Sequence, residues 1–254
     1  MMLDLQKASV LKRASAWLLD VILLLILVVG ICSGLSALLG VDQHSADLEA
    51  HYARYETEYG VKFSITQEEY AAMTEEGRAN YDKAYEALIA DKEAMYAYNM
   101  VLNLTLIVVS IGILLGYLIL EFAVPMFLGN GQTVGKKIFG LGVMRVHGVK
   151  MNGVAMFIRT LLGKYTLETM IPVLVVIMLM FNVTGLMGTL LVLGIWLTQI
   201  ILMIVTRTNS TIHDLLADCV VVDLSSQLIF DTEEELLDYK KRMSAENAAQ
   251  QSYF

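Results

Sequence analysis

Long apolar stretches dominate the chain and predict membrane-spanning helices. Three windows are almost free of charge, at residues 17–39, about 100–122 and about 167–206. A helix rises about 1.5 Å per residue and the hydrocarbon core is about 30 Å thick, so one crossing takes about 20 residues. The last window is about twice that length, and Asn182 to Gly185 is its only polar, turn-forming break. We therefore predict four spans, the last two joined by a tight turn.

The segment between the first two spans, residues 41–98, has helical patterning. Its tyrosines recur at helical spacings, and Thr66 with Glu69 forms a capping-box signature, in which each side chain bonds the backbone N–H of the other residue. We predict two or three amphipathic helices here. The last is expected to run unbroken from about Glu75 into the second span, because no proline or turn cluster lies between them.

The segment after the second span combines short helical and strand patterns. A brief interfacial helix is indicated near Val134, and residues 141–151 are typical of a strand, a turn and a second strand. After Asn152 the apolar residues share one face. This is typical of a helix lying in the membrane plane, with Arg159 and Lys164 available to the lipid headgroups.

Beyond the fourth span the chain predicts one strand and one helix. Residues 219–224 are a strand candidate, which we expect to pair with the strand near Val143 because an isolated hairpin is marginally stable. The tail from Asp231 to about Gln250 predicts a charged helix. Its acidic residues precede its basic ones, an order that suits the helix dipole.

Composition strengthens the membrane interpretation. The 254 residues are 56% hydrophobic with a mean hydropathy of +0.59, which is too apolar for an ordinary soluble domain. The first apolar run is longer than the core of a cleaved signal peptide and carries Asp20 near its start, so we interpret it as an uncleaved anchor. Cys32 and Cys219 fall in different segments and do not predict a disulfide.

The charges sort by segment and predict the orientation. Basic residues cluster before the first span, between the second and third, and after the fourth. By the positive-inside rule these three segments, and both termini, are cytoplasmic. Residues 41–98 are left outside, and their 13 acidic and five basic residues account for the whole net charge of −8. This acidic cap is either an attractor for cations or a partner, or a solvated helical hairpin packed on its own tyrosines.

Together these patterns predict an all-α membrane protein with four transmembrane helices, an extracytoplasmic helical insertion, and a small cytoplasmic element made of a β-hairpin and an amphipathic helix. We expect a multi-pass protein of the bacterial cytoplasmic membrane. The predicted segments are residues 1–40 for the N-terminus and first span, 41–98 for the acidic insertion, 99–123 for the second span, 124–165 for the cytoplasmic loop, 166–206 for the third and fourth spans, and 207–254 for the tail.

Ionisable residues at membrane depth carry the functional signal. Each costs roughly 2.5–3.5 kcal/mol at the centre of a spanning helix and persists only when it is paired or hydrated. Asp20 lies inside the first span, and Arg13 lies on the same helix face about 10 Å away along the axis, too far for a direct pair. Partners must therefore come from other segments. The predicted functional cluster at the inner ends of the spans consists of Arg13, Asp20, Glu121, Arg207, His213 and Asp214.

A structural interpretation competes with this functional one. The two arginines would then only extend toward the headgroups, and Asp20 would be a buried polar contact between helices. Glu168 lies at the same level, but Lys164 precedes it by four residues and is expected to neutralise it locally.

Three blocks of sequence form a recognisable pattern. They are Arg13-x-x-Ala16-x-x-x-Asp20, Gly131-Gln132-Thr133-Val134-Gly135-Lys136-Lys137, and Arg207-x-x-x-Thr211-Ile212-His213-Asp214. This pattern resembles the RDD family, which is named for one arginine and two aspartates; by position they map onto Arg13, Asp20 and Asp214. The resemblance implies an integral membrane fold and a suspected role in transport, and it names no substrate. The candidate site residues of the middle block are Gly131, Gln132, Thr133, Gly135 and Lys136.

The chain departs from the family pattern in two places. Gly142 stands where the family usually has a basic residue, and Asp218-Cys219 stands where it usually has Gly-Thr. These departures bear on local loop contacts. The segment 41–98 falls outside the three blocks.

Other motifs fail on spacing. The glycines after the second span mimic a phosphate-binding loop, but a span precedes them in place of a strand and the Walker spacing is absent. The four histidines are scattered without metal-ligand spacing, and no Ser-His-Asp or Cys-His set converges. We therefore expect no enzyme, no cofactor, no metal site and no nucleic-acid partner.

Two functional hypotheses follow. In the first, the chain is a small transporter or ion- and proton-coupling protein in which Asp20 and Asp214 exchange protons or cations while Arg13 tunes their charge. Because four helices enclose little volume, its pathway would form between the subunits of a homo-oligomer. In the second, the chain is a non-catalytic scaffold or assembly factor that docks protein partners through the acidic insertion and the C-terminal helix. A water-reachable Asp20–Asp214 pair favours transport, whereas dry pairing with Arg13 and Arg207 favours a structural latch.

Overall fold

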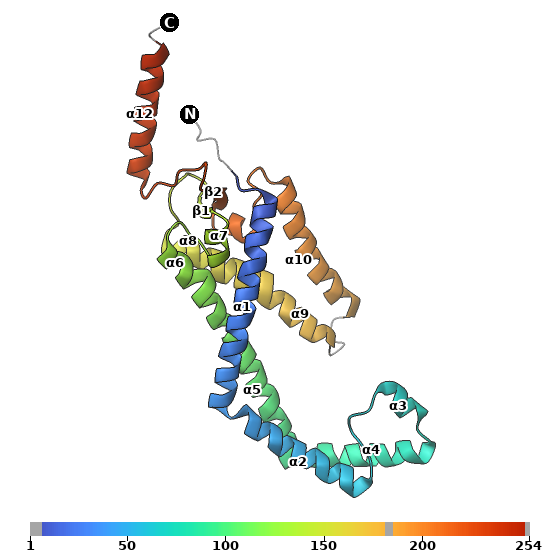
Figure 1. Ribbon diagram of the computed structural model, residues 1–254. Helices are drawn as coiled ribbons and strands as arrows, with labels where there is room; N and C mark the ends of the chain where they lie inside the picture. The colour runs from blue at the N-terminus through green and yellow to red at the C-terminus, as the bar shows by residue number, and fades with distance from the viewer. Residues whose placement is uncertain (1–6, 181–184, 252–254) are drawn as a thin grey trace. The chain divides into compact units, whose positions relative to one another are not determined.

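The computed structural model describes residues 7–180 and 185–251 and is mostly helical (Figure 1). Within those residues, four helices are long and apolar enough to cross a membrane, and one two-stranded sheet is present. The predicted all-α class with four spans is confirmed. The chain divides into two compact units, one formed by Val28–Ile113 and one by the remaining described residues.

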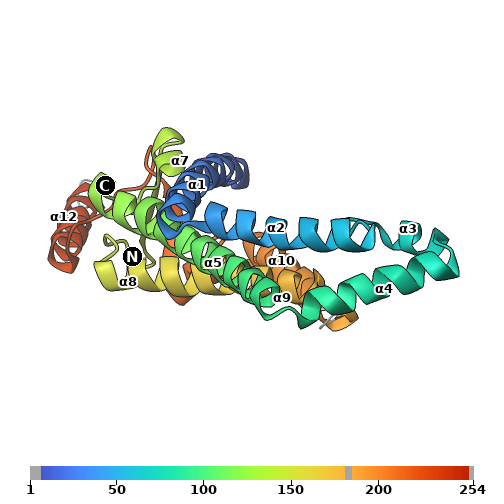
Figure 2. The same ribbon diagram turned by 90° about the horizontal axis from the view of Figure 1, so that it is seen from below.

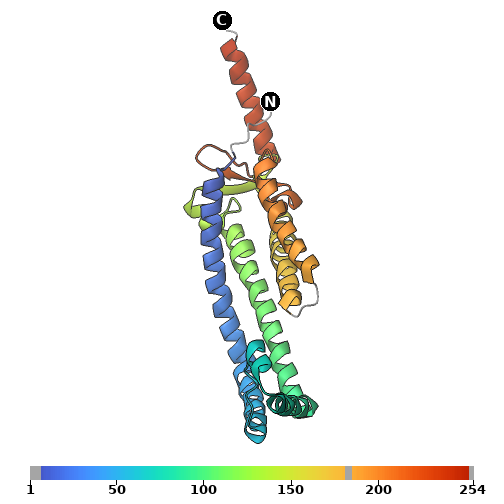
Figure 3. The ribbon, with the colours of Figure 1, turned by 90° about the vertical axis from the view of Figure 1, so that its right-hand side faces the viewer.

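Each span is one continuous helical rod. In chain order the rods are α1 (Val10–Leu39); α5, η1 and α6 (Lys92–Tyr117, Leu118–Ala123 and Val124–Leu128); α8, η2 and α9 (Gly153–Phe157, Ile158–Met170 and Ile171–Met180); and α10 (Gly185–Val205). The segments η1 and η2 are π-helical. α9 and α10 run side by side (Figure 3). The predicted turn between them falls on residues 181–184, outside the described residues.

The helix expected in the membrane plane after Asn152 is instead the first part of the third span. Asn152 caps α8 by accepting a hydrogen bond from the Ala155 N–H at 2.8 Å. From there the helix continues through η2 into α9. No turn separates the two patterns, so they belong to one rod. Arg159 and Lys164, expected at the headgroups, are buried in this structure.

The smaller unit contains the acidic insertion. α2 (Val41–Tyr59) and α4 (Glu75–Ala90) pack along each other, and α3 (Gln67–Ala72) lies at the tip where one ends and the other begins (Figure 2). The predicted capping box at the start of α3 is confirmed. Aromatic rings pack edge to face within the insertion, with centroids 5.4–5.8 Å apart. The rings are those of Tyr52, Phe63, Tyr70 and Tyr81.

The helix predicted to run unbroken from Glu75 into the second span is interrupted at Asp91. α4 ends one residue before Asp91 and α5 begins one residue after it. The Asp91 backbone is extended, and its carboxylate accepts hydrogen bonds from the Glu93 N–H at 2.9 Å and from Arg54 at 2.5 Å. Aspartate competes with the helix in this way because its side chain can cap the following turn. The prediction of an unbroken helix considered only prolines and turn-forming residues, and it did not consider that the Asp91 side chain could cap a new helix.

The larger unit contains a two-stranded antiparallel sheet. β1 (Leu141–Arg145) pairs with β2 (Cys219–Asp223), and Val143 lies opposite Val221, so the predicted pairing is confirmed. The residues of this pair are largely buried and pack with Ala8, which precedes α1. Residues at least 74 positions apart in the sequence are thereby paired, which joins the segment that follows the second span to the segment that follows the fourth.

Three helices lie next to the two strands in the chain order, two of them short. α7 (Val134–Ile138) precedes β1, α11 (Ile212–Leu216) precedes β2, and α12 (Glu233–Gln251) forms the expected charged tail helix. The predicted second strand of a local hairpin is reduced to one isolated bridge between Met144 and Lys150. β2 provides a longer pairing for β1 than the local return segment does, so the sheet forms between distant strands.

Candidate functional site

Asp214 is the centre of a buried charge network. It lies in the first turn of α11, which begins after Thr211, and its side chain is 0% exposed. The hydroxyl and the backbone N–H of Thr211 both donate to Asp214 Oδ2, at 2.9 and 3.3 Å. These bonds fix the first turn of the helix. The Thr-x-x-Asp spacing therefore aims this carboxylate into the interior of the unit.

Two arginines from different spans neutralise Asp214. Arg13 of α1 donates to Oδ2 at 2.7 Å, and Arg159 of η2 donates to Oδ1 from Nε and Nη2 at 3.1 and 2.8 Å. Arg13 also donates to the carbonyl of Asn209 at 2.6 Å. Burial alone would raise the pKa of Asp214, but the charges of His213 and the two arginines outweigh it and hold this pKa well below its usual value. Asp214 is therefore ionised at neutral pH, where it binds both arginines.

Asp20 of α1 does not contact Asp214; it binds the start of α7 instead. Its carboxylate accepts hydrogen bonds from the Thr133 hydroxyl at 2.5 Å and the Gly135 N–H at 2.7 Å. The Nζ atom of Lys136 lies 3.8 Å from Oδ2 of Asp20. Asp20 is thus bound mainly by neutral donors, and it attaches the loop motif to the first span.

Gly135 makes this attachment possible. A Cβ atom at this position would overlap the carbonyl oxygen of Ala16 and would meet the Asp20 carboxylate at 2.9 Å. Because the Gly135 backbone of α7 lies directly against the Ala16 backbone of α1, no side chain can rotate away to make room. Two other loop-motif residues fix the chain just before α7. Gly131 adopts a left-handed conformation with a φ of +59°, and the Gln132 side chain donates to the Leu141 carbonyl at 2.8 Å.

Glu121 of η1 forms an ion pair with Lys164 of η2. Pro125 has no N–H, so the Glu121 carbonyl lacks its usual donor four residues ahead. The Thr160 hydroxyl donates to this carbonyl at 2.9 Å instead. The second and third spans are therefore joined through both the side chain and the backbone of Glu121.

Glu168 pairs with His213 and not, as expected, with Lys164. Nδ1 of His213 lies 2.8 Å from Glu168 Oε1, and the His213 backbone N–H donates to the same oxygen at 3.1 Å. Burial lowers the pKa of His213 more than the adjacent carboxylates raise it. A Cβ atom on Gly163 would lie 2.5 Å from His213 Cβ, so this glycine permits the close packing of η2 on α11.

The two π-helical segments follow one sequence rule. The chain has two prolines, and each stands four residues after an acid of the network, in Glu121-x-x-x-Pro125 and Glu168-x-x-x-Pro172. The N–H groups of Val124 and Ile171, at the ends of η1 and η2, bond carbonyls five residues back. π-helical turns often occur at functional sites. The repeated spacing was a signal in the sequence that the prediction did not use.

Lys136 is the least tightly paired cation of the network. Its ammonium donates to the Thr133 hydroxyl at 3.1 Å, and its nearest carboxylate in the described chain is that of Asp20, at 3.8 Å. Its side chain is only 10% exposed. Burial, followed by the charge of Lys164, lowers the pKa of Lys136 to about 7. Glu121 and Asp20 oppose this shift without cancelling it.

Comparison with known proteins identifies the family. The model of the RDD family matches residues 7–218, which is most of the chain and spans all three sequence blocks. The chain belongs to the RDD family. No curated protein and no solved structure matches it. The family residues of this RDD protein anchor two separate contacts: Arg13 and Asp214 bind each other, whereas Asp20 binds the loop motif.

Arg207 is the one predicted member of the RDD cluster that the structure leaves out. It is exposed, and it forms no ion pair with any described residue. It follows the last residue of α10. The buried position beside Asp214 is occupied by Arg159 instead. Sequence reasoning missed Arg159 because its segment was assigned to the membrane surface.

Proposed function

We propose that this RDD-family integral membrane protein couples proton and cation exchange at the face of the network formed by Asp20, Thr133 and Lys136. One observation carries the proposal. Among the basic side chains of the described network, Arg13, Arg159 and Lys164 each lie within 2.8 Å of a carboxylate oxygen, whereas Lys136 approaches none closer than 3.8 Å. Lys136 is therefore the basic side chain of the network that loses its proton most readily.

The chemistry of exchange follows from the lowered pKa. Near pH 7 the Lys136 amine loses its proton in a fraction of molecules. Asp20 then keeps its two neutral donors and loses its nearest cation. A cation from solution compensates the carboxylate, and reprotonation of Lys136 expels it. The Lys136 ammonium and the entering cation compete for the same position beside the Asp20 carboxylate, so proton movement and cation movement are coupled.

Asp214 takes a different role from Asp20 in this proposal. Its carboxylate is held by two guanidinium groups that stay charged at every accessible pH. It anchors α1 and η2 to α11 while exchange takes place at Asp20. By the distribution of basic residues we propose that the network faces the cytoplasm with both termini inside, and that a pathway forms between subunits of a homo-oligomer.

Flux through reconstituted protein tests the proposal. In proteoliposomes containing a pH-sensitive dye, pulses of lithium, sodium, potassium or rubidium chloride are expected to release protons, with a half-change near pH 7. Asp20→Asn should lower this flux at least about tenfold, because the amide carries no negative charge to hold the entering cation, and a factor of ten corresponds to about 1.4 kcal/mol. Lys136→Arg should abolish it at every pH, because guanidinium keeps its proton.

The control for this experiment is Asp218→Asn, at a side chain that is 52% exposed. It should leave flux unchanged, and thermal melting of each detergent-purified variant shows that the protein is folded. Equal flux in Asp20→Asn and the unmodified protein would exclude the exchange mechanism.

A scaffold function is the second candidate, and the dry pairing of Asp214 favours it. A carboxylate with 0% exposure between two arginines is the geometry of a structural latch. The protein would then serve as a rigid membrane anchor, with the acidic insertion and α12 as docking surfaces.

Deletion of Gln43 to Ala90 tests this candidate. If the insertion docks a partner, crosslinking of the unmodified protein in membranes yields a defined adduct and the deletion removes it. A second deletion that removes α12 (Glu233–Gln251) assigns the tail separately. Unchanged adducts in both deletions would contradict a docking role.

A further inference from the structure

The imidazole ring of His213 lies between two carboxylates of the buried network. Its Nδ1 atom is 2.8 Å from both carboxylate oxygens of Glu168 on η2, and its Nε2 atom is 3.4 Å from Oδ1 of Asp214. A neutral imidazole carries a proton on only one of its two nitrogens. In the neutral form one nitrogen lone pair therefore faces a carboxylate, whereas an imidazolium donates to both acids.

The polar groups beside the ring do not supply the missing proton. The Thr211 hydroxyl lies 3.1 Å from Nε2 of His213, but it donates its one proton to Asp214 at 2.9 Å. The carboxamide oxygen of Gln199 on α10 accepts from the Ile212 N–H at 3.2 Å. The His213 side chain is only 11% exposed, so its ring is largely shielded from water. The ring is thus a buried group with room for one more proton.

The titratable groups around His213 come from its own helix and from the elements packed against it. They are Asp214 of α11, Glu168 and Arg159 of η2, Arg13 of α1, which acts through Asp214, and Cys219 of β2, whose Sγ lies 3.7 Å from Asp214. Burial and the charge of Arg159 lower the pKa of His213, whereas Asp214 and Glu168 oppose this shift. The protonation of His213 therefore depends on the balance of charge in the network.

The buried network is electrically neutral when His213 is uncharged. Among the described residues it contains four carboxylates and four cations, which are Asp20, Glu121, Glu168 and Asp214, and Arg13, Lys136, Arg159 and Lys164. Loss of the Lys136 proton leaves one negative charge without a partner, which is costly in a buried site. Lys136 and His213 share surroundings, because burial, and also the charge of Arg159, lowers the pKa of each. A proton on His213 would restore the balance.

We propose that His213 is a second proton-binding site of the network and takes up a proton when Lys136 loses its own. One N–H bond breaks at Lys136 and one forms at His213, and the imidazolium donates from Nδ1 to Glu168 and from Nε2 to Asp214. This role rests on the proposed exchange at Asp20, because it belongs to the interval in which Lys136 is neutral and no cation has entered. A cation that enters beside Asp20 restores neutrality, and the proton leaves His213.

Nuclear magnetic resonance of the full-length protein in detergent, with ring-labelled histidine, tests this site. The chain has four histidines. The signal missing in His213→Gln, or the one that remains when the other three are replaced, identifies His213. Lys136→Met removes the ammonium and should raise the proton affinity of His213 at least about threefold, because charges in a protein interior act across several residues. Lys136→Arg keeps the charge and should leave this affinity at or below that of the unmodified protein.

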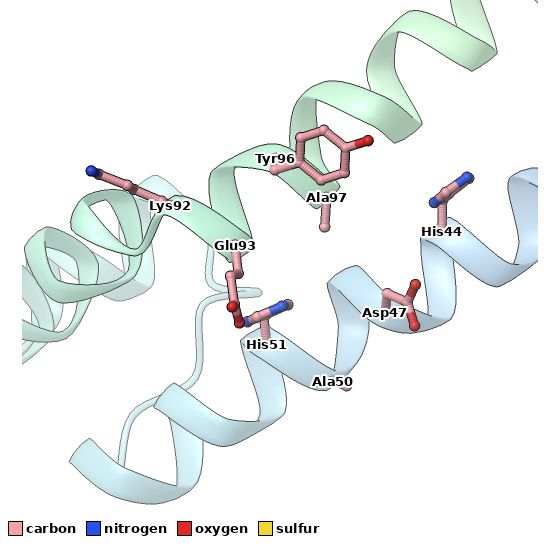
Figure 4. Close-up of a pocket in the computed structure, with 8 residues that line it drawn as sticks. All are labelled: His44, Asp47, Ala50, His51, Lys92, Glu93, Tyr96 and Ala97. Atoms are coloured by element: carbon pink, nitrogen blue, oxygen red, sulfur yellow. The ribbon is translucent and has the colours of Figure 1, made fainter.

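The matched control is Lys137→Met, which removes an exposed ammonium from the same short helix. It should leave the titration of His213 unchanged, and thermal melting shows that each variant is folded. His51 serves as an internal reference, since it belongs to the smaller unit, where Figure 4 shows it with His44 beside a surface pocket. Its titration should be the same in every variant. Equal titration of His213 in Lys136→Met and Lys137→Met overturns the second site.

The two experiments separate the second site from the exchange itself. If flux falls in Asp20→Asn as expected but His213 titrates alike in Lys136→Met and Lys137→Met, exchange at Asp20 stands and the second proton site is overturned. If flux is absent but Lys136→Met alone raises the proton affinity of His213, the second site is supported and the exchange mechanism is contradicted.

Discussion

Asp214→Asn is expected to lower the free energy of unfolding by about 3–5 kcal/mol, the range for breaking a buried ion pair from one side. The substitution removes the charge and leaves Arg13 and Arg159 buried beside a neutral amide. Both guanidinium groups then lose the partner that compensates their removal from water. Because the three groups come from α1, η2 and α11, the loss separates elements far apart in the sequence.

Thermal unfolding in detergent measures this effect, with Asp218→Asn as the control. Asp218 is four residues away and pairs with Arg145 at 3.3 Å, but it is 52% exposed. A surface pair contributes about 0–1 kcal/mol, so the control should melt almost as the unmodified protein does. Equal melting of both variants would contradict a central role for Asp214.

The pH dependence of this contribution has a definite sign. The folded-state pKa of Asp214 is depressed, so its stabilising effect is complete above the ordinary carboxyl pKa and is lost only as pH falls through the folded value. The difference in melting between Asp214→Asn and the unmodified protein should therefore stay constant from about pH 5 to 8. A difference that disappears near neutral pH would contradict the assignment.

Gly135→Ala is the second substitution with a large expected effect. The added Cβ atom overlaps the Ala16 carbonyl and meets the Asp20 carboxylate at 2.9 Å, so α7 has to move away from α1. Overpacking of this kind typically costs about 1–3 kcal/mol. The movement also breaks the hydrogen bonds from Thr133 and Gly135 to Asp20. Stability and the flux attributed to Asp20 should therefore fall together.

The control is Gly194→Ala, in the middle of α10, where an added Cβ atom meets nothing within 4 Å. It should leave melting unchanged or raise it slightly, because alanine favours the helix by up to about 1 kcal/mol over glycine. Melting and proteoliposome flux of the two variants give the comparison. A Gly135→Ala protein as stable and active as Gly194→Ala would show that the contact of α7 with α1 is dispensable.

Local patterns along the chain were sufficient for much of this fold. Apolar length determined the four spans, because a helix has a fixed rise and hydrocarbon a fixed thickness. The capping box at Thr66 depends on residues three apart, and strand composition with the scarcity of local partners predicted the pairing of Val143 with Val221. Each of these features is decided by neighbours in sequence or by a property of the bilayer.

The break at Asp91 and the π-helical segments were harder to predict. A single aspartate ends one helix and begins the next through its side-chain hydrogen bonds, a choice that also depends on Arg54 reaching it from α2. Pro125 and Pro172 displace the backbone bonding of their helices, which turns different side chains inward than an ideal helix would. Arg159 and Lys164 were assigned to the wrong environment for another reason: the shared apolar face after Asn152 predicted a helix in the membrane plane, whereas that segment is the first part of the third span.

The sequence by itself determined that charges at membrane depth require partners, and it placed Asp20, Glu121 and Asp214 at one end of the spans. Only the tertiary structure decided the pairing: Arg13 reaches Asp214 across 201 positions, Arg159 takes the place expected for Arg207, and Asp20 binds the backbone of the loop motif. The physical reason is that the requirement for neutralisation depends on residue type and depth, whereas the identity of each partner depends on how distant helices rotate and pack.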